Sequence, residues 1–337
     1  MSLSHPLVCL GHSLLDISAA VSVEMFEKYG VRAGNAILAE EKHMPIFKEL
    51  VDNYPCDFIA GGASQNTCRA AQWLSRTENF TGFIGVVGED EYSQHLRDSV
   101  KAAGVNAYYQ VEPTVPTGTC ACLIHEKERS LIANLAAAQM LKLDYLRSIW
   151  HVIENCSVIY AEGYMFSSAV DCVVESAKYA CENGKIFTMN VSAQFIIEFF
   201  REPMMRAWPY CEYVFGNEDE TQKFGEVFGF GSDVVEAAKQ MSLMPTNTPR
   251  PKKIVVTRGK DTVLIACEGK VTEYNVPLIP SEKVLDLNGA GDSFVGGFLC
   301  ELIKGGSYER CVAAGNYLAS EVIQLSGCSF PAVPSFN

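Results

Sequence analysis

The 337-residue sequence lacks the segments that mark secreted and membrane-spanning proteins. No basic region followed by a long apolar run opens the chain, which argues against a signal peptide. No stretch approaches the ~20 consecutive apolar residues that a membrane helix needs. Basic residues are in the minority, with 27 Lys and Arg against 40 Asp and Glu and a net charge of −13. So acidic a surface argues against nucleic acid or an anionic membrane as the main partner.

Two familiar nucleotide-binding motifs and the paired cysteines of zinc sites are missing too. No Gly-Lys-Ser or Gly-Lys-Thr occurs, so the chain has no Walker-type phosphate loop. Gly289-x-Gly291 has Phe294 where the dinucleotide pattern requires a third glycine, which makes a nicotinamide enzyme a poor candidate. The 13 cysteines are scattered, and the one close pair, Cys120-x-Cys122, shows the alternation of a strand. Reduced, mostly buried thiols are typical of a cytoplasmic protein, and presence in the nucleus stays open.

What the sequence contains is an alternation of short apolar runs with amphipathic segments. With 48% hydrophobic residues, it can form a large core in one domain or in a domain with a smaller appendage. The runs predict strands that alternate with helices, as in an α/β fold. Strands are expected at 7–11, 58–62, 83–88, 157–161, 186–190, 212–216, 254–257 and 262–267, and helices at 68–75, 89–103, 169–183, 233–243, 293–303 and 308–325, with a linker at 245–253.

Residues 107–135 break this alternation. Short strands follow one another there, separated by Pro113, Pro116 and a charged turn at 126–129. Hairpins inserted into an α/β chain predict a small sheet of its own, as in a lid. The strands are expected at 108–111, 118–124 and 130–133.

The stretch 286–294 carries the sharpest chemical signal. Val284 and Leu285 before it predict a strand, a glycine turn follows, and the apolar run after Ser293 predicts a helix. The first helical N–H groups lie at the positive end of the helix dipole, and glycines leave them open to an anion. Asp292, in the first helical turn, can take a proton from an alcohol. An anion cradle beside a carboxylate suits phosphoryl transfer to a hydroxyl, but an ordinary turn with an acidic first helical turn explains these residues equally well.

Polar residues also follow other predicted strands. Asp16 either lies where ligands collect in open parallel sheets or caps a turn. Asn66, after a pair of glycines, can donate to and accept from sugar hydroxyls. Asn217 and Glu220 form a helix capping box or hold the waters of Mg²⁺, and both can be true of one pair. Arg129, on the charged turn, is either a solvated charge or a phosphate clamp.

Motifs spread over nearly the whole chain resemble those of the ribokinase (PfkB-type) kinases. The Asn-Gly-Ala-Gly-Asp stretch marks the wider family, and Arg-Ser-Leu-Ile-Ala-Asn-Leu is more specific to its adenosine kinase branch. They occur in the family's order, at 61–66, 116–120, 129–138, 215–220, 288–292 and 327–331. The resemblance implies a three-layer α/β fold, with a central, mostly parallel sheet flanked by helices, plus a small β-sheet lid. It places the large nucleotide-binding and catalytic domain at 1–16, 64–106 and 140–337, and the lid domain at 17–63 and 107–139.

The resemblance also implies a role for each site residue. Asp292 matches the catalytic base, and Arg129 matches the lid arginine that approaches the phosphates. The backbone of Gly289, Ala290 and Gly291 matches the anion hole. Residues expected to hold the nucleoside are Asp16, Leu38, Gly61, Gly62, Asn66, Cys120, Leu131, Ala133 and Phe195. Those expected around ATP are Asn217, Glu220, Thr257, Gly259 and Asn288, with Asn217 and Glu220 reaching the metal through water.

The sequence departs from the family's pattern around the base. His12 stands where the family commonly has Asn, and Ala63 stands where it often has Ser. Met165 occupies the position of a stacking aromatic, which leaves Tyr164 or Phe166 as the alternative partner of the base.

The activity that the resemblance implies is transfer of the γ-phosphoryl group of MgATP to the 5′-hydroxyl of adenosine, giving AMP in purine salvage. Mg²⁺ and ATP are the expected cofactors, and K⁺ is a further candidate. The protein is expected to be a monomer. One alternative is a kinase of another purine nucleoside or of a sugar, with the same machinery. Another is a nucleoside-binding or regulatory protein that has kept the fold and lost the chemistry.

Overall fold

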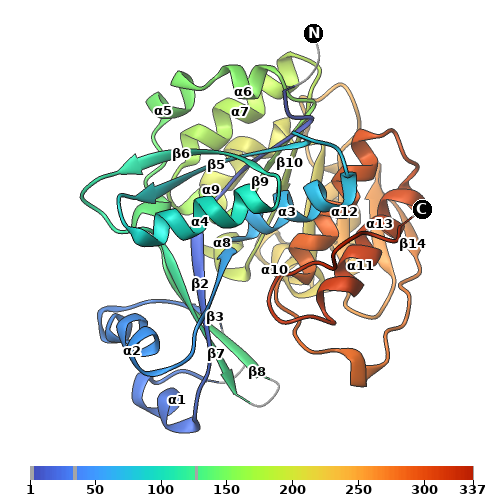
Figure 1. The fold of residues 1–337 in the computed structure, drawn as a ribbon. Coiled ribbons are helices and arrows are strands. Elements are labelled where there is room, and N and C mark those ends of the chain that lie inside the picture. Colours follow the sequence, from blue (N-terminus) through green and yellow to red (C-terminus); the bar gives the residue numbers. More distant parts are fainter. Residues whose placement is uncertain (1–3, 33–35, 126–127, 337) are drawn as a thin grey trace.

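The computed structural model describes residues 4–32, 36–125 and 128–336, which form two β-sheets and the helices that cover them (Figure 1). Within these ranges no helix is long and apolar enough to cross a bilayer. The large sheet has nine strands and the small sheet has five. The three-layer α/β fold with a second, smaller sheet is therefore as expected from the sequence.

The large sheet has the strand order β14-β13-β12-β11-β10-β9-β1-β5-β6. All neighbours from β6 to β12 pair in parallel, and only the last two strands are antiparallel. A strand buried on both faces reads as a continuous apolar run, which is why the sequence pattern located most of them. The strands are β1 (Leu7–Leu10), β5 (Thr81–Gly88), β6 (Asn106–Glu112), β9 (Val158–Ala161), β10 (Ile186–Asn190), β11 (Tyr213–Asn217), β12 (Lys253–Thr257), β13 (Val263–Cys267) and β14 (Lys270–Tyr274).

Helices cover both faces of the large sheet. Val8 and Leu10 point to one face, and Leu7 and Cys9 point to the other, as the two-residue period of a strand requires. The first face packs against α5 (Leu143–Ser148), α6 (His151–Glu154), α7 (Val170–Glu182), α8 (Gln194–Phe199), α9 (Arg201–Ala207), α10 (Glu218–Phe228) and α11 (Val234–Leu243). The second packs against α3 (Ala63–Ser75), α4 (Glu91–Ala102), α12 (Ala290–Ile303) and α13 (Tyr308–Val322).

The small sheet has one face against helices and the other against the cavity described below. Ile17, Ala121 and Ile132 pack on α1 (Val23–Tyr29) and α2 (Pro45–Asn53). Their sequence neighbours point the opposite way, because successive side chains alternate between faces. The strand order is β3 (Ala36–Leu38), β8 (Glu128–Asn134), β7 (Thr119–His125), β2 (Leu14–Ala20) and β4 (Asp57–Gly61).

Two strand expectations are wrong. The segment 108–111 was expected in the small sheet, but it lies in β6, which pairs in parallel with β5 at the edge of the large sheet. Residues Val284 and Leu285 do not form a strand; the Leu285 side chain is 61% exposed, and its amide donates to the Ile323 carbonyl at 2.8 Å. The glycine turn is therefore held from α13 and not by a strand. Residues 126–127 of the expected charged turn lie outside the described ranges.

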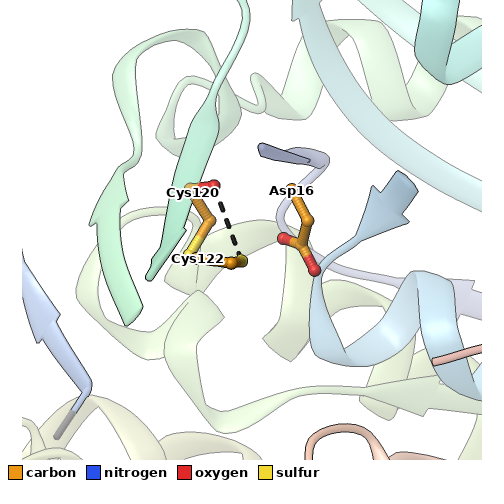
Figure 2. Close-up of side chains that lie close together, drawn as sticks. All are labelled: Asp16, Cys120 and Cys122. Atoms are coloured by element: carbon orange, nitrogen blue, oxygen red, sulfur yellow. Dashed lines mark hydrogen bonds between the residues drawn. The ribbon is translucent and has the colours of Figure 1, made fainter. Parts of the chain in front are cut away.

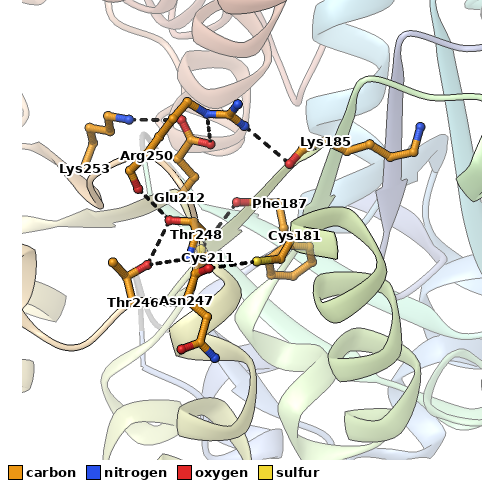
Figure 3. A network of polar contacts seen from close by, with 10 residues as sticks. All are labelled: Cys181, Lys185, Phe187, Cys211, Glu212, Thr246, Asn247, Thr248, Arg250 and Lys253. Carbon is orange, nitrogen blue, oxygen red and sulfur yellow. Dashed lines mark hydrogen bonds and ion pairs between the residues drawn. The ribbon is translucent and has the colours of Figure 1, made fainter. Parts of the chain in front are cut away.

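The expected linker at 245–253 is anchored by a polar network (Figure 3). Glu212 is buried, and its carboxylate accepts from Arg250 at 2.7 Å and from Lys253 at 3.0 Å. The Thr248 hydroxyl donates to the Arg250 carbonyl at 2.6 Å, which shapes the loop before β12. The buried carboxylate is thus paired on both oxygens, and the second positive charge, on Arg250, is partly exposed to solvent, so this network fixes the connection between α11 and β12.

Candidate active site

A cavity of about 530 Å³ is lined by residues of both sheets, a size that suits a ligand larger than a single sugar. Most residues that the sequence assigns to the site meet here, although they come from segments far apart in the chain. Those that line it are Asp16, Leu38, Gly62, Asn66, Cys120, Leu131, Ala133, Phe195, Asn217, Glu220, Thr257, Asn288, Gly289, Gly291 and Asp292. Four assigned residues, Gly61, Arg129, Gly259 and Ala290, are not part of the lining.

Asp292 lies in the first turn of α12 and faces the cavity. Its Oδ2 accepts a hydrogen bond from Asn66 Nδ2 at 3.0 Å, and its backbone carbonyl accepts from the Thr67 hydroxyl at 3.1 Å. Both partners lie near the start of α3, so the N-termini of two helices meet at this carboxylate. Burial raises the pKa of Asp292 to about 6, while the Asn66 hydrogen bond opposes the rise.

Of the two glycines at the start of α12, Gly289 is required by the turn and Gly291 leaves backbone open. Gly289 has φ +75°, and a Cβ there would approach Cys328 Cβ to 2.8 Å, so only glycine fits. A Cβ at Gly291 would meet no atom within 4 Å, which means that this part of the backbone is open to the cavity. The Ala290 amide makes a long turn hydrogen bond of 3.3 Å to the Leu287 carbonyl. The turn thus offers exposed backbone at the positive end of a helix.

Asp16, on β2, projects from the small sheet into the cavity. Its side chain packs directly over Gly61, where a Cβ would lie 2.3 Å from Asp16 Oδ1. Gly62 has φ +94°, and a Cβ there would lie 2.1 Å from the His12 carbonyl oxygen. Gly61 therefore acts by making room for a carboxylate and not by lining the cavity itself.

Glu162 is a cavity residue that the sequence analysis did not single out. It follows β9, is 1% exposed, and accepts from the backbone amides of His12 at 2.8 Å and Ser64 at 2.7 Å. It thus ties the end of β1 to the start of α3. Its position directly after a buried strand is the signal that could have identified it, since ligands gather at the carboxyl ends of parallel strands.

Asn217 and Glu220 form the capping box at the start of α10. Asn217 Oδ1 accepts from the Glu220 amide at 2.8 Å, and Glu220 Oε2 accepts from the Asn217 amide at 2.9 Å. The prediction of a capping box is therefore confirmed. Both residues also line the cavity, so they are available to a ligand or to hydrated Mg²⁺ as well. Thr257 lies opposite Asn217 in the parallel pairing of β11 and β12, Asn288 directly precedes Gly289, and both line the cavity.

The cavity contains four buried carboxyl groups, and of these only Asp16 has cations, Arg129 and Arg69, that lower its pKa. Burial raises the pKa of Asp16, Glu162 and Glu220 to about 7 in each case. The Asp292 charge raises all three further, which indicates that the four carboxyls share one electrostatic environment. Such a cluster is stabilised by a cation or by hydroxyl donors from a ligand.

Arg129 pairs outside the cavity lining. Its guanidinium forms an ion pair with Asp286 and donates to the Ser18 hydroxyl. Asp286 in turn accepts from the amides of Asn288 at 2.9 Å and Gly327 at 2.8 Å. Arg129 therefore connects the small sheet to the glycine turn, and its approach to phosphates stays a prediction.

The positions that depart from the family pattern have distinct surroundings. Tyr164 lines the cavity with its ring 6.0 Å from that of Phe195, whereas Met165 and Phe166 are buried in the core below the large sheet. Of the two aromatic candidates, only Tyr164 lines the cavity. His12 lines the cavity and its Nε2 lies 3.0 Å from the Ser168 hydroxyl, while burial lowers its pKa to about 4.

Other cavity residues were also missed from the sequence. Ser192 has φ +65°, a strained conformation for a residue other than glycine, and it is held by its amide donating to Asn190 Oδ1 at 2.8 Å. Its hydroxyl accepts from the Gly163 amide at 2.8 Å, which joins the loops after β9 and β10. No sequence signal marks such a backbone conformation. The remaining missed lining residues are Leu14, Ile37, Leu135, Ser167, Asn190, Phe200, Phe215, Gly216, Phe294 and Val295.

Comparison with known proteins agrees with this arrangement. The pfkB family carbohydrate kinase pattern matches residues 24–335. The chain is 42% identical to adenosine kinase 2 of Arabidopsis thaliana, covering 98% of this chain and 97% of that one. It is 40% identical to the adenosine kinase of Schizosaccharomyces pombe, covering 97% of each.

Solved structures give the same result. The Anopheles gambiae adenosine kinase in complex with P1,P4-di(adenosine-5) tetraphosphate superposes with a TM-score of 0.93, at 39% identity and full coverage of both chains. The Schistosoma mansoni adenosine kinase in complex with 2-fluoroadenosine has a TM-score of 0.92 at 30% identity, covering 98% of each chain. The chain therefore belongs to the pfkB family of carbohydrate kinases, within its adenosine kinase branch.

Proposed function

We propose that the chain transfers the γ-phosphoryl group of ATP to the 5′-hydroxyl of adenosine, giving AMP and ADP. The observation that carries the proposal is the pairing of the Asp292 carboxylate with the open backbone of Gly291 at the same helix N-terminus and on the same cavity. The full-length relatives that carry the name adenosine kinase support this substrate.

Asp292 is the proposed general base. Its pKa of about 6, raised by burial, leaves it ionised at neutral pH and still basic enough to accept a hydroxyl proton. The Asn66 amide fixes the orientation of the carboxylate by binding Oδ2, which leaves Oδ1 for the substrate. Negative charge on the transferred group is stabilised by the amides of the glycine turn.

The nucleoside is held between the two sheets. Asp16 and Asn66, which both line the cavity, supply an acceptor and a donor for the ribose hydroxyls. Leu38, Leu131 and Ala133 give the small-sheet side an apolar surface for the purine, and the Tyr164 ring lies across from it. Leu38 is 50% exposed without ligand, so a bound purine would cover it.

The donor set at the other end of the cavity fits Mg²⁺, which prefers oxygen ligands and retains its waters. Glu220 is 8% exposed with its pKa raised by burial, so its carboxylate lacks the positive charge that would stabilise it. Asn217 and Glu220 would reach the ion through water because their inner hydrogen bonds close the capping box. When bound, the ion would screen the charge of the polyphosphate. Thr257, Gly259 and Asn288 are the proposed contacts of ATP.

The small sheet is the proposed lid. Residues 17–63 and 113–139 belong to it in this proposal, since β6 pairs in the large sheet. Arg129 joins it to Asp286 beside the glycine turn, so closing the lid would also exclude water that competes as an acceptor.

The decisive experiment is a phosphorylation assay with adenosine, inosine, guanosine and ribose as acceptors at saturating MgATP. Adenosine should have a kcat/KM at least 10-fold above any other acceptor, a difference that a pocket with apolar walls can supply. A larger kcat/KM with ribose or inosine would support the alternative kinases, and tight adenosine binding without ADP formation would support a binding protein.

Three further properties belong to this proposal. A requirement for K⁺ rests on the family resemblance, and is tested by replacing K⁺ with N-methylglucamine. A cytoplasmic location is supported by free thiols at all 13 cysteines. A monomer is tested by sedimentation at assay concentrations.

A further inference from the structure

Three potential metal ligands converge where β2 and β7 pair in the small sheet (Figure 2). Asp16 lies directly opposite Cys120 in the parallel register, and Cys122 follows two residues later on the same face. One carboxylate oxygen and the two Sγ atoms all lie within 4.8 Å of one another. Asp16 and Cys120 line the cavity, whereas Cys122 is fully buried behind them.

The Asp16 carboxylate is an unsatisfied group in this arrangement. It is 9% exposed and faces the cavity, and no side-chain or backbone donor in the described ranges forms a hydrogen bond with it. The Cys122 thiol contacts the Cys120 thiol and lies 3.7 Å from the Cys120 carbonyl oxygen, so the two thiols partner only residues of this same cluster among the contacts of the described ranges. A buried carboxylate without donors costs free energy that a cation can recover.

The charge of a metal-bound state also balances. Two thiolates and one carboxylate carry three negative charges, and a divalent ion cancels two. The third is offset by Arg69, which is buried beside Asp16 and donates to neutral acceptors, the Ala60 carbonyl at 2.8 Å and the Asn66 side chain at 3.5 Å. Arg129 also lies near Asp16 and Cys122, but its charge is already paired with Asp286.

The ligand types select the kind of ion. Thiolates favour Zn²⁺ and Cd²⁺ over Mg²⁺, and three protein ligands with one open position form a common zinc arrangement. Ligand atoms around Zn²⁺ stand roughly 3.8 Å apart for a Zn–S distance of about 2.3 Å. The three atoms therefore need to close by about 1 Å or less, which side-chain rotation on neighbouring strands can provide.

We propose that Asp16, Cys120 and Cys122 form an inhibitory site for a thiophilic divalent cation such as Zn²⁺, and that this ion and the nucleoside exclude each other. Binding replaces the two thiol protons, which pass to solvent, with two metal–sulfur bonds, and no redox change takes place. The ion and the nucleoside compete because Asp16 cannot bind the ion and the ribose at the same time. This competition rests on the proposed function, in which Asp16 binds the ribose. The site itself does not depend on it.

The test is a titration of the reduced, metal-free full chain with Cd²⁺, followed through the ultraviolet thiolate-to-metal charge-transfer band. We expect one Cd²⁺ per chain, and an affinity at least 10-fold weaker in Cys122→Ser. Cys68→Ser is the matched control, because Cys68 is also fully buried and its thiol also donates to a backbone carbonyl, that of Gly82 at 3.3 Å. Cys120→Ser provides a second variant, and thermal melting without metal checks that each variant folds.

Adenosine separates the two parts of the proposal. At ten times its own dissociation constant it should raise the apparent Cd²⁺ dissociation constant about 10-fold. In the kinase assay, Zn²⁺ should raise KM for adenosine without changing kcat, and Cys122→Ser should remove this effect. Equal Cd²⁺ affinity in wild type, Cys122→Ser and Cys120→Ser would overturn the site. Unchanged Cd²⁺ affinity in protein shown by calorimetry to bind adenosine would overturn the competition, whereas failure to bind adenosine at all would count against the proposed function alone.

Discussion

Asn66 and Asp292 are joined by a hydrogen bond of 3.0 Å that links the N-terminal turns of α3 and α12. The two residues are 226 positions apart in the chain. Two helix N-termini at one point place partial positive charge under a buried carboxylate, which favours its ionised form against the cost of burial. This relationship positions the proposed base.

The first prediction concerns that base. Asp292→Asn should lower kcat by roughly 10²–10⁴-fold, because the amide cannot accept the hydroxyl proton. The dissociation constant of adenosine, measured by calorimetry, should change less than threefold. Asp261→Asn, at an exposed position, is the control and should retain full kcat. Full turnover in Asp292→Asn would remove this residue from the role.

The second prediction concerns the room that Gly61 leaves for Asp16. Gly61→Ala places a Cβ about where the Asp16 carboxylate lies, at 2.3 Å from Oδ1, so Asp16 must move. Adenosine affinity should fall at least 10-fold, comparable to the loss in Asp16→Ala. Gly184→Ala is the control: it strains a backbone with φ +68° but meets no atom within 4 Å, so it should lower stability and leave affinity intact. Equal affinity in Gly61→Ala and wild type would contradict the placement of Asp16.

The third prediction is a pH dependence of stability in the ligand-free protein. Burial raises the pKa of Asp16 from 3.8 to about 7, so the folded state binds this proton more tightly than the unfolded state. The stability it contributes is complete below the unfolded pKa and is lost as pH rises through about 7, at about 1.4 kcal/mol per pH unit in between. Urea denaturation at pH 5 and pH 8 should therefore show a smaller loss in Asp16→Asn than in wild type. The same loss in both proteins would show that Asp16 has an ordinary pKa.

The fourth prediction separates the two roles of Asn217. Asn217→Ala removes the helix cap and should cost about 1 kcal/mol of stability, in addition to weakening MgATP binding. Asn217→Ser keeps a good capping group but loses the amide that donates to Glu220 at 3.0 Å, so stability should be nearly retained while KM for MgATP rises. An unchanged KM in both variants would confine the pair to capping.

The sequence predicts the parts of this protein that depend on local pattern. Buried parallel strands such as β1 and β9 are continuous apolar runs, and the capping box at Asn217 has a fixed spacing. The sequence did not assign β6 to the correct sheet, because the residues of a strand do not determine which other strand it pairs with. The antiparallel strand β14 was not foreseen, since three of its five side chains are exposed.

The candidate site follows the same division. Asp292 and Asn66 were identified because they lie in the first turns of helices beside glycines. Asp16 was identified because it follows the first apolar run, but it lies within strand β2 and neither ends a strand of the large sheet nor caps a turn. Glu162 and Ser192 were not identified from the sequence. Glu162 accepts hydrogen bonds from the backbone amides of two distant segments, which a local pattern cannot show. Ser192 has a left-handed backbone conformation, which its residue type does not predict. Gly61 was expected to hold the nucleoside; it does not line the cavity, and it leaves space for the Asp16 side chain.

Asp286 receives donors from three separate parts of the chain: the Arg129 guanidinium of the small sheet, the Asn288 amide of the glycine turn, and the Gly327 amide near the C-terminus. A single carboxylate thus joins the small sheet, which is the proposed lid, to the glycine turn, which is the proposed anion hole. Withdrawing Arg129 would leave Asp286 with only its two amide partners, so the tightness of the turn and the angle of the small sheet vary together. In the proposed kinase, opening of the cavity to substrate and the positions of the turn amides would then change together.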